Sequence, residues 1–274
     1  MTDGSTADGS GPPIPDGLDA TLVLVRHGES EFIVENRFQG QAETPLSPTG
    51  LRQAAAVAER MAHPHAAPAL PIGDGPLREL VHSPLRRTTQ TAEALVAAMP
   101  TPPPVRAEPG LTEIGQGDWE GLHRDEIGAT YGDILAAWRR APTTAWAPNG
   151  ESLAQVQARV RPALARILGT LADGGRPGTL DRDQVSGYAT TPTTEPWSIV
   201  VGHDGVFKVT LLTLFDLPLE RFWMWTMDLC AITVVEFRAG RAVLRAHNLT
   251  GHLASLLDEA AQEAQERRSR SGAL

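Results

Sequence analysis

The sequence predicts an α/β fold, a three-layer αβα sandwich whose sheet is mostly parallel with one antiparallel edge strand. Three observations favour this fold. Short runs of β-branched and aliphatic residues alternate with helical patterns, two of these runs are followed by a histidine (His27 and His203), and a hairpin pattern surrounds Ala239-Gly240-Arg241. Parallel strands joined by helical crossovers are covered by helices on both faces, so the sheet is expected to form the middle layer.

Each expected element has a local signal. Strands are expected where β-branched or aliphatic residues cluster, over 22–26, 79–82 and 198–202, with the closing hairpin over 231–238 and 242–247. Helices are expected where apolar residues recur at helical spacing, over 47–61, 83–99, 124–139, 152–171 and 206–215. Ser47 before Pro48, and Ser83 before Pro84, are typical of an N-cap followed by the first helical residue.

The chain is expected to form one domain with loose ends. Residues 1–19 are rich in Gly, Pro, Ser and Asp and are interpreted as a disordered leader. A single domain is expected over 20–257, with a flexible insertion at 173–196 where apolar periodicity is lost. Residues 258–274 are interpreted as a charged C-terminal tail.

Composition excludes several classes of function. A net charge of −9 and a pI near 5.4 argue against nucleic acid as a partner, although a local basic pocket would suit a small anionic substrate. The single cysteine, Cys230, excludes an intramolecular disulfide and a multi-cysteine metal site, and neither a metal nor a cofactor is expected. No stretch has the pattern of a membrane span or a signal peptide, so a cytoplasmic protein is expected. The edge hairpin could support a homodimer.

Two expected strands end in a histidine. Arg26-His27-Gly28 follows the apolar run 21–25, and Gly202-His203-Asp204 follows the run 198–201. Ligands bind at the carboxyl edge of open α/β sheets, where both histidines are expected to lie. The fixed cation of Arg26 suits an anionic centre, and Gly28 is expected to let the backbone approach a ligand.

Two further segments carry candidate chemistry. Arg87 lies about one turn into the helix expected after Ser83, where a forked cation and free helix amides favour phosphate oxygens. Glu113 lies between apolar neighbours in a glycine-punctuated loop, where a partly desolvated carboxyl group could serve as a general acid. Taken alone, each has a simpler reading, as a solvated helix face and a surface glutamate.

The four segments together, in this order, resemble the histidine phosphatase superfamily, also called the phosphoglycerate mutase-like family, and in particular its phosphatase branch. The resemblance covers about residues 22–253. It implies that His27 is the nucleophile that becomes phosphohistidine and that Glu113 donates a proton to the leaving oxygen. It also implies that Arg26, Arg87 and His203 bind the phosphate.

The resemblance extends further, with two departures. Arg37 matches a position often near the substrate, and Gly150-Glu151-Ser152 with Arg159 matches a recurrent helix start. Ile33 stands where the family usually has a phosphate-binding asparagine, a role that Asn36 or Ser30 would have to fill. Asp204 stands where the family commonly has glycine. Its carboxylate either faces the substrate pocket and repels anions or points outward as a helix cap.

Three functions are compatible with these residues. The first is a metal-independent phosphomonoesterase that acts on a small phosphorylated metabolite. The second is a cofactor-dependent phosphoglycerate mutase. The resemblance disfavours it, because mutases of the family carry a longer insertion before the Gly-Glu-Ser helix, whereas only a short segment follows Arg139-Arg140 here. The third is a non-catalytic phospho-ligand-binding protein. Ile33 favours this reading, whereas the presence of His27, Arg87, Glu113 and His203 disfavours it. Trp223 and Trp225, with Phe222 and Met224, are expected to pack in the core.

Overall fold

The computed structural model describes residues 12–173, 194–256 and 259. The greater part of the predicted leader, nearly all of the predicted insertion and most of the predicted tail lie outside these residues. Within the described ranges, no helix has the length and apolar character that crossing a membrane requires.

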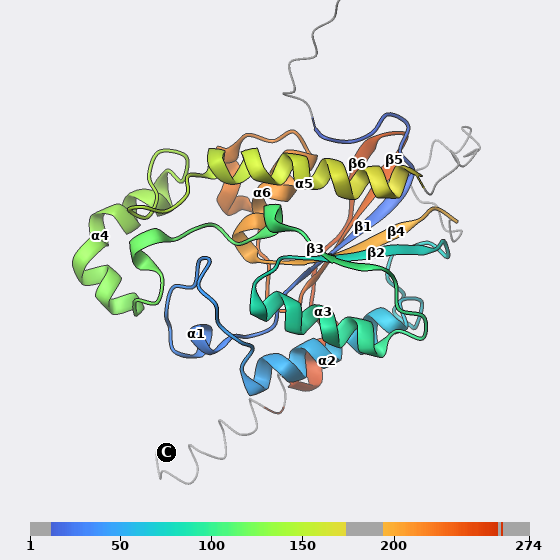
Figure 1. Ribbon diagram of the computed structural model, residues 1–274, viewed down its shortest axis with the longest axis horizontal. Helices are drawn as coiled ribbons and strands as arrows, with labels where there is room; N and C mark the ends of the chain where they lie inside the picture. The colour runs from blue at the N-terminus through green and yellow to red at the C-terminus, as the bar shows by residue number, and fades with distance from the viewer. Residues whose placement is uncertain (1–11, 174–193, 257–258, 260–274) are drawn as a thin grey trace, which may run out of the picture.

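A six-stranded sheet forms the centre of the fold (Figure 1). Its strand order is β3 (Val105–Ala107), β2 (Leu77–His82), β4 (Trp197–Gly202), β1 (Ala20–Arg26), β5 (Ile232–Arg238) and β6 (Arg241–Leu249). The first four are mutually parallel, β5 is antiparallel to β1, and β6 is antiparallel to β5. The predicted fold class is confirmed. The strand that runs against the others is β5, and it lies one position in from the edge because β6 pairs along its outer side.

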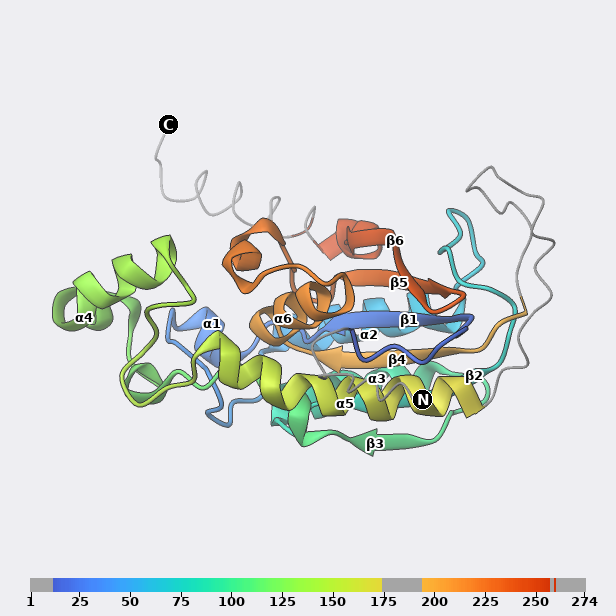
Figure 2. The same cartoon turned by 90° about the horizontal axis from the view of Figure 1, so that it is seen from above.

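Helices cover both faces of the sheet, as Figures 1 and 2 show. On one face lie α2 (Pro48–Ala62) and α3 (Arg86–Ala98), and on the other lie α5 (Leu153–Asp173) and α6 (Asp204–Leu214). Side chains alternate across β1: Val23 and Val25 pack in the cluster with α2 and α3, whereas Leu22 and Leu24 pack in the cluster with α5 and α6. Two separate apolar cores therefore fix the sheet between two helical layers.

A smaller unit lies beyond the carboxyl ends of β1 and β4. It contains the one-turn helix α1 (Glu31–Val34) and helix α4 (Arg124–Arg140), which extends away from the three layers in Figure 1. Helix α4 packs its buried Ile127 and Leu135 around Trp119, which is fully buried. The short 3₁₀ turns η1 (Pro109–Leu111), η2 (Gly117–Trp119), η3 (Leu219–Met224) and η4 (Gly251–Leu253) link these elements.

The helix starts show where the local signals succeed and fail. Ser47 is the N-cap of α2, and its hydroxyl accepts a hydrogen bond from Gly50 N–H at 3.0 Å, as predicted. The predicted start of α3 at Ser83 is wrong, because the helix begins at Arg86 after Leu85. The Ser83 hydroxyl contacts His203 instead. Helix α6 begins at Asp204, directly after His203 and two residues earlier than predicted.

The described end of the predicted leader contacts the hairpin. Leu18 is buried, and its carbonyl accepts a hydrogen bond from Gly240 N–H at 2.9 Å. Asp19 accepts a hydrogen bond from Ala239 N–H at 2.7 Å. These contacts fasten residues before β1 to the turn between β5 and β6.

Candidate active site

The register of two parallel strands brings the predicted histidines together. Arg26 at the end of β1 is paired with Gly202 at the end of β4, so the next residues, His27 and His203, lie side by side. The two ring centroids are 5.1 Å apart with an interplanar angle of 63°. Both side chains are buried, at 2% and 0% exposure. Strand pairing therefore assembles half of the predicted site.

The hydrogen bond of His27 selects its tautomer. Nδ1 lies 2.6 Å from the carbonyl oxygen of Gly28, and a carbonyl only accepts hydrogen bonds, so Nδ1 carries the proton. This leaves the lone pair on Nε2. Burial, and then the positive charges of Arg87 and Arg26, hold the pKa of His27 well below its ordinary value of 6.5. The ring is accordingly neutral at physiological pH and has a nucleophilic nitrogen.

The glycine after His27 has a packing role. A Cβ on Gly28 would lie 2.5 Å from the carbonyl oxygen of Gly50, in the first turn of α2. Gly28 therefore lets the end of β1 approach that helix. The sequence instead predicted that Gly28 lets the backbone approach a ligand.

The ring of His203 is held between a serine and an arginine. Nδ1 accepts a hydrogen bond from Arg87 Nε at 3.3 Å, and Nε2 lies 2.8 Å from the hydroxyl oxygen of Ser83. Because Nδ1 accepts, the proton lies on Nε2 and is donated to Ser83. Burial, and then the charges around it, above all Arg87, hold the pKa of His203 well below 6.5.

Arg87 is fully buried at the first turn of α3 and links three parts of the site. Besides its bond to His203, Nη1 donates to the carbonyl of Ala42 at 3.0 Å, and Nη2 donates to that of Gly40 at 2.8 Å. These bonds use three of the five N–H groups of the guanidinium, so two remain for an oxyanion. Burial lowers the pKa of Arg87 to about 10, partly offset by Glu113 and Glu43, and the group stays charged at neutral pH.

Arg26 supplies the second cation. Its Nη1 donates to the carbonyl of Met227, and its charge acts on His27, Arg87 and His203. Its Nε is buried without a hydrogen-bond partner among the described residues. A buried, unpartnered N–H on a cation is costly unless a ligand satisfies it. Arg26 therefore offers a donor to an anion beside the two rings.

Glu113 reaches the same place from the loop between η1 and η2. Its carboxylate accepts three backbone hydrogen bonds, from Ile114 at 2.9 Å, Gly205 at 3.1 Å and Val206 at 3.0 Å. The amides of Gly205 and Val206 lie in the first turn of α6, where N–H groups have no acceptor within the helix. His203 is the N-cap residue of this helix. A Cβ on Gly205 would lie 2.6 Å from Ile114 Cδ1 and 2.7 Å from a Glu113 oxygen, so a larger residue here would displace the Glu113 carboxylate.

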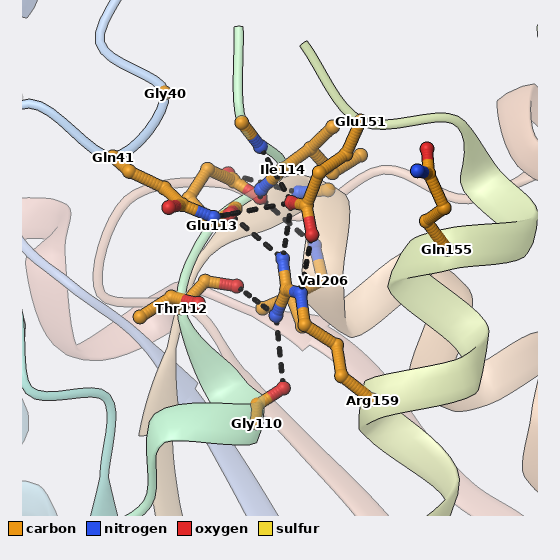
Figure 3. A network of polar contacts seen from close by, with 12 residues as sticks. Gly40, Gln41, Gly110, Thr112, Glu113, Ile114, Glu151, Gln155, Arg159 and Val206 are labelled. Carbon is orange, nitrogen blue, oxygen red and sulfur yellow. Dashed lines mark hydrogen bonds and ion pairs between the residues drawn. The ribbon is translucent and has the colours of Figure 1, made fainter.

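The backbone around Glu113 is fixed by a charged network, drawn in Figure 3. Arg159 of α5 uses all five of its N–H groups, donating to Glu151 through Nε and Nη2 and to the carbonyls of Gly110, Thr112 and Glu113. Burial raises the pKa of the Glu151 carboxyl group, but the donors on it, led by Arg159, outweigh burial and leave that pKa lowered. The pair is thus ionised at neutral pH.

Gln41 joins this network to the loop that holds Arg87. Its side-chain amide donates to the carbonyl of Glu113 at 3.0 Å and to the Glu151 carboxylate at 3.1 Å. The neighbouring carbonyls of Gly40 and Ala42 bind Arg87. Sequence reasoning missed this loop because its role depends on backbone carbonyls, which leave no signal in residue type.

Arg37 and the residues near Ile33 have other partners. Arg37 donates to Glu35 at 2.8 Å and to the carbonyl of Gly121 at 2.7 Å, and its substrate role stays a prediction. The Ile33 backbone N–H donates to Ser30 Oγ at 3.3 Å, and that hydroxyl donates to Gln39 at 2.6 Å. Ser30 therefore caps α1 and is already engaged.

Asp204 is paired with a lysine of its own helix. One carboxylate oxygen accepts a hydrogen bond from Lys208 Nζ at 2.7 Å, one helical turn further on. The prediction of core packing is wrong for Trp223 and Met224, which are 42% and 54% exposed, whereas Phe222 is buried. Among the described residues, no group of three or more His, Cys, Asp or Glu side chains could hold a metal ion.

Comparison with known proteins shows which family the chain belongs to. The sequence pattern of the histidine phosphatase superfamily (branch 1) matches residues 22–175 and 185–250. The chain is 34% identical over 202 residues to glucosyl-3-phosphoglycerate phosphatase of Mycobacterium tuberculosis, covering 73% of this chain and 78% of the relative. It is 27% identical over 242 residues to phosphoserine phosphatase 1 of Hydrogenobacter thermophilus, covering 87% of this chain and 97% of the relative.

A third relative and a solved structure complete the comparison. A probable phosphoglycerate mutase of Proteus mirabilis is 35% identical over 221 residues, covering 79% of this chain and 85% of the relative. The structure of a mycobacterial glucosyl-3-phosphoglycerate phosphatase with inorganic phosphate is 30% identical with a TM-score of 0.65, covering 85% of this chain and 98% of that one. Sequence pattern and fold agree over most of the chain, and the protein belongs to the histidine phosphatase superfamily, branch 1.

Proposed function

We propose that this protein hydrolyses phosphate monoesters of a small metabolite through a phosphohistidine at His27. The observation that carries the proposal is the neutral, buried ring of His27, with its free Nε2, beside three donors for an oxyanion. Arg26 contributes one unpartnered N–H, and Arg87 contributes two N–H groups. Preorganised donors of this kind stabilise the charge that spreads over phosphoryl oxygens in the transition state.

In the first step, His27 Nε2 attacks phosphorus and the bond to the leaving oxygen breaks. The hydrogen bond from Nδ1 to Gly28 stabilises the positive charge that develops on the ring. The leaving oxygen takes a proton from Glu113, which must carry that proton before the step begins. The alcohol departs and the phosphoryl group stays on Nε2.

In the second step, water attacks the phosphohistidine. The Glu113 carboxylate takes a proton from this water, the nitrogen–phosphorus bond breaks, and inorganic phosphate leaves. Both carboxylate oxygens accept hydrogen bonds from backbone N–H groups, which supports the proposal that Glu113 is the base for this step. The two guanidiniums supply the positive charge that metal ions supply in other phosphoryl-transfer enzymes, so we propose that no metal is needed.

The substrate is proposed at the level of class. The named substrates of two relatives, glucosyl-3-phosphoglycerate and phosphoserine, are small phosphate monoesters, and they are the first compounds to test on this chain. The acidic chain is not expected to bind nucleic acid. A cytoplasmic location and a homodimer formed through the edge hairpin also remain proposals.

The test is phosphate release from a panel of phosphorylated metabolites, by the wild type and by His27→Asn. The wild type is expected to release phosphate from at least one ester, with EDTA present or absent, and His27→Asn is expected to release none. His65→Asn, which alters an exposed histidine, serves as the matched control and should keep wild-type activity. Full activity in His27→Asn would remove His27 as nucleophile, and loss of activity in EDTA would remove the metal-free mechanism.

The same panel separates the two alternatives. The mutase is favoured by the similarity to a probable phosphoglycerate mutase, and it would convert 3-phosphoglycerate to 2-phosphoglycerate with little free phosphate. The phospho-ligand-binding protein would bind esters in calorimetry and release phosphate from none of them. Either result would overturn the proposed hydrolysis.

A further inference from the structure

Asp204 carries a negative charge next in sequence to His203, a residue of the proposed anion site. Asp204 directly follows His203, whose ring packs on that of His27, and it is the first residue of α6. Its side chain is 30% exposed, so it is neither deeply buried nor fully solvated. A negative charge here would repel a phosphate dianion unless another group compensates it.

Lys208 is placed to compensate this charge. Its Nζ lies 2.7 Å from an Asp204 oxygen, and its side chain is only 7% exposed. The ammonium group also lies 5.4 Å from the ring centroid of Phe222 and 5.2 Å from that of Trp223, distances at which a cation is attracted to an aromatic face. Lys208 is therefore held in one position, where it points at Asp204.

The segment that holds Lys208 also contacts helix α4 and Arg26. Trp223 packs edge-to-face on Trp138 of α4, with ring centroids 4.7 Å apart. Four residues after Trp223, the carbonyl of Met227 accepts a hydrogen bond from Arg26. The segment from Trp223 to Met227 thus runs from the Lys208 ammonium to one of the two phosphate-binding cations.

We propose that Lys208 is a positioning residue for substrate binding: held by Phe222 and Trp223, it neutralises Asp204 and so allows phosphate to bind next to His203. Lys208 does not contact the phosphate in this account. The inference rests on the proposed function, because it assumes that the site binds phosphate. The proposal also explains how this chain tolerates an aspartate at position 204, where the histidine phosphatase superfamily commonly has glycine.

The test compares Lys208→Met with the double variant Asp204→Asn/Lys208→Met. Methionine fills a similar volume without the charge, so Asp204 is left uncompensated. Binding of inorganic phosphate is measured by calorimetry, and KM and kcat are measured on the best ester of the panel. Lys208→Met is expected to weaken phosphate binding and raise KM by about tenfold, with kcat within about threefold of the wild type. The double variant is expected to recover most of that loss.

Two outcomes would overturn the inference. If Lys208→Met binds phosphate as tightly as the wild type, no compensation is needed. If the double variant stays as weak as Lys208→Met, Lys208 binds the phosphate itself. A wild type that binds phosphate without hydrolysing any ester would remove the proposed hydrolysis. This inference would still stand, because it depends only on phosphate binding.

A single variant and a conservative one keep the test informative if Lys208→Met does not fold. Asp204→Asn removes the negative charge and keeps the lysine, so it is expected to bind phosphate at least as tightly as the wild type. Lys208→Arg keeps the positive charge and is expected to bind within about threefold of it. Weaker phosphate binding by Asp204→Asn would contradict the account.

Discussion

The two ring nitrogens of His27 have different surroundings, and this difference decides which of them can react. Nδ1 is occupied by the carbonyl of Gly28 at 2.6 Å, so Nε2 keeps the lone pair. His203 is constrained in the opposite sense, with Nε2 toward Ser83 and Nδ1 toward Arg87. At the residue scale, the site is therefore a pair of neutral rings whose tautomers are set by Gly28 after β1, Ser83 after β2 and Arg87 in α3.

Glu113 is the residue whose role is tested most simply. Glu113→Gln keeps the shape of the side chain but cannot donate a proton to the leaving oxygen or take one from water. We expect kcat to fall by about 10²- to 10⁴-fold, the usual contribution of a positioned acid or base. Steady-state kinetics on the best ester measures this change.

Folding must be controlled in this variant, because Glu113 also accepts amide hydrogen bonds from α6. Circular dichroism and phosphate binding should stay close to those of the wild type. A kcat within about threefold of the wild type would show that another group moves the proton.

At the scale of elements, α5 acts on the candidate site through the loop that carries Glu113. Arg159 holds the carbonyls of Gly110, Thr112 and Glu113, and Glu151 holds Arg159. The loop that presents Glu113 is thus tied to a long helix of the outer layer, as Figure 3 shows. Helix α5 thus supports the loop that carries the proposed proton-transfer group.

Arg159→Met tests this support. It removes the hydrogen bonds that Arg159 donates to three backbone carbonyls and to the Glu151 carboxylate, so we expect the free energy of unfolding to fall by about 1–3 kcal/mol. We also expect kcat to fall more than KM rises, because the Glu113 loop loses its anchor and the phosphate ligands do not. Urea unfolding and steady-state kinetics give the two values.

The matched control is Arg139→Met, which alters an exposed arginine of α4 and should leave both quantities near wild type. If Arg159→Met lowers stability and leaves kcat unchanged, Arg159 has a structural role only.

Element boundaries show what sequence patterns can and cannot give. The long helices and the buried strands were predictable, because their periodicity reflects burial on one face or on both. Strand β3 was not, because three residues are too few to show alternation. Ser83 carried the signal of an N-cap but serves as a partner of His203, and only the register of β2 against β4 reveals this.

The candidate site divides in the same way. His27, His203, Arg87 and Glu113 each follow a motif and were predictable, and the structure brings them together. The loop from Gly40 to Ala42 was not predictable, because its role depends on backbone carbonyls. The pairing of Asp204 with Lys208 was not predictable either, because the position of Lys208 depends on the packing of η3. Local patterns therefore point to the reacting groups better than to the groups that position them.

At the scale of the whole molecule, burying two neutral histidines links stability to pH. In the unfolded chain each histidine titrates near its ordinary pKa of about 6.5, and in the folded chain both pKa values are well below it. The unfolded state therefore binds more protons as the pH falls below 6.5, and folding stability falls with it. Above that pH this contribution to stability is fully present.

We expect the free energy of unfolding to decrease progressively as the pH is lowered from 6.5 toward the lowered pKa values of the folded state. His27→Gln removes one of the two groups and should make this decrease shallower. Urea unfolding at a series of pH values measures both. A wild type with constant stability from pH 6.5 to about 5 would contradict the burial of two neutral rings.

The central claim is that phosphate is transferred to His27 on its way to water, and trapping the intermediate tests it most directly. The enzyme is mixed with its best ester labelled in the phosphoryl group, quenched in alkali within the first turnovers, and digested for peptide mapping. We expect an acid-labile, alkali-stable label on the peptide that contains His27, and its accumulation should increase in Glu113→Gln if that residue activates the water. Label on another residue, or turnover without any labelled enzyme in the wild type and in Glu113→Gln, would contradict the account.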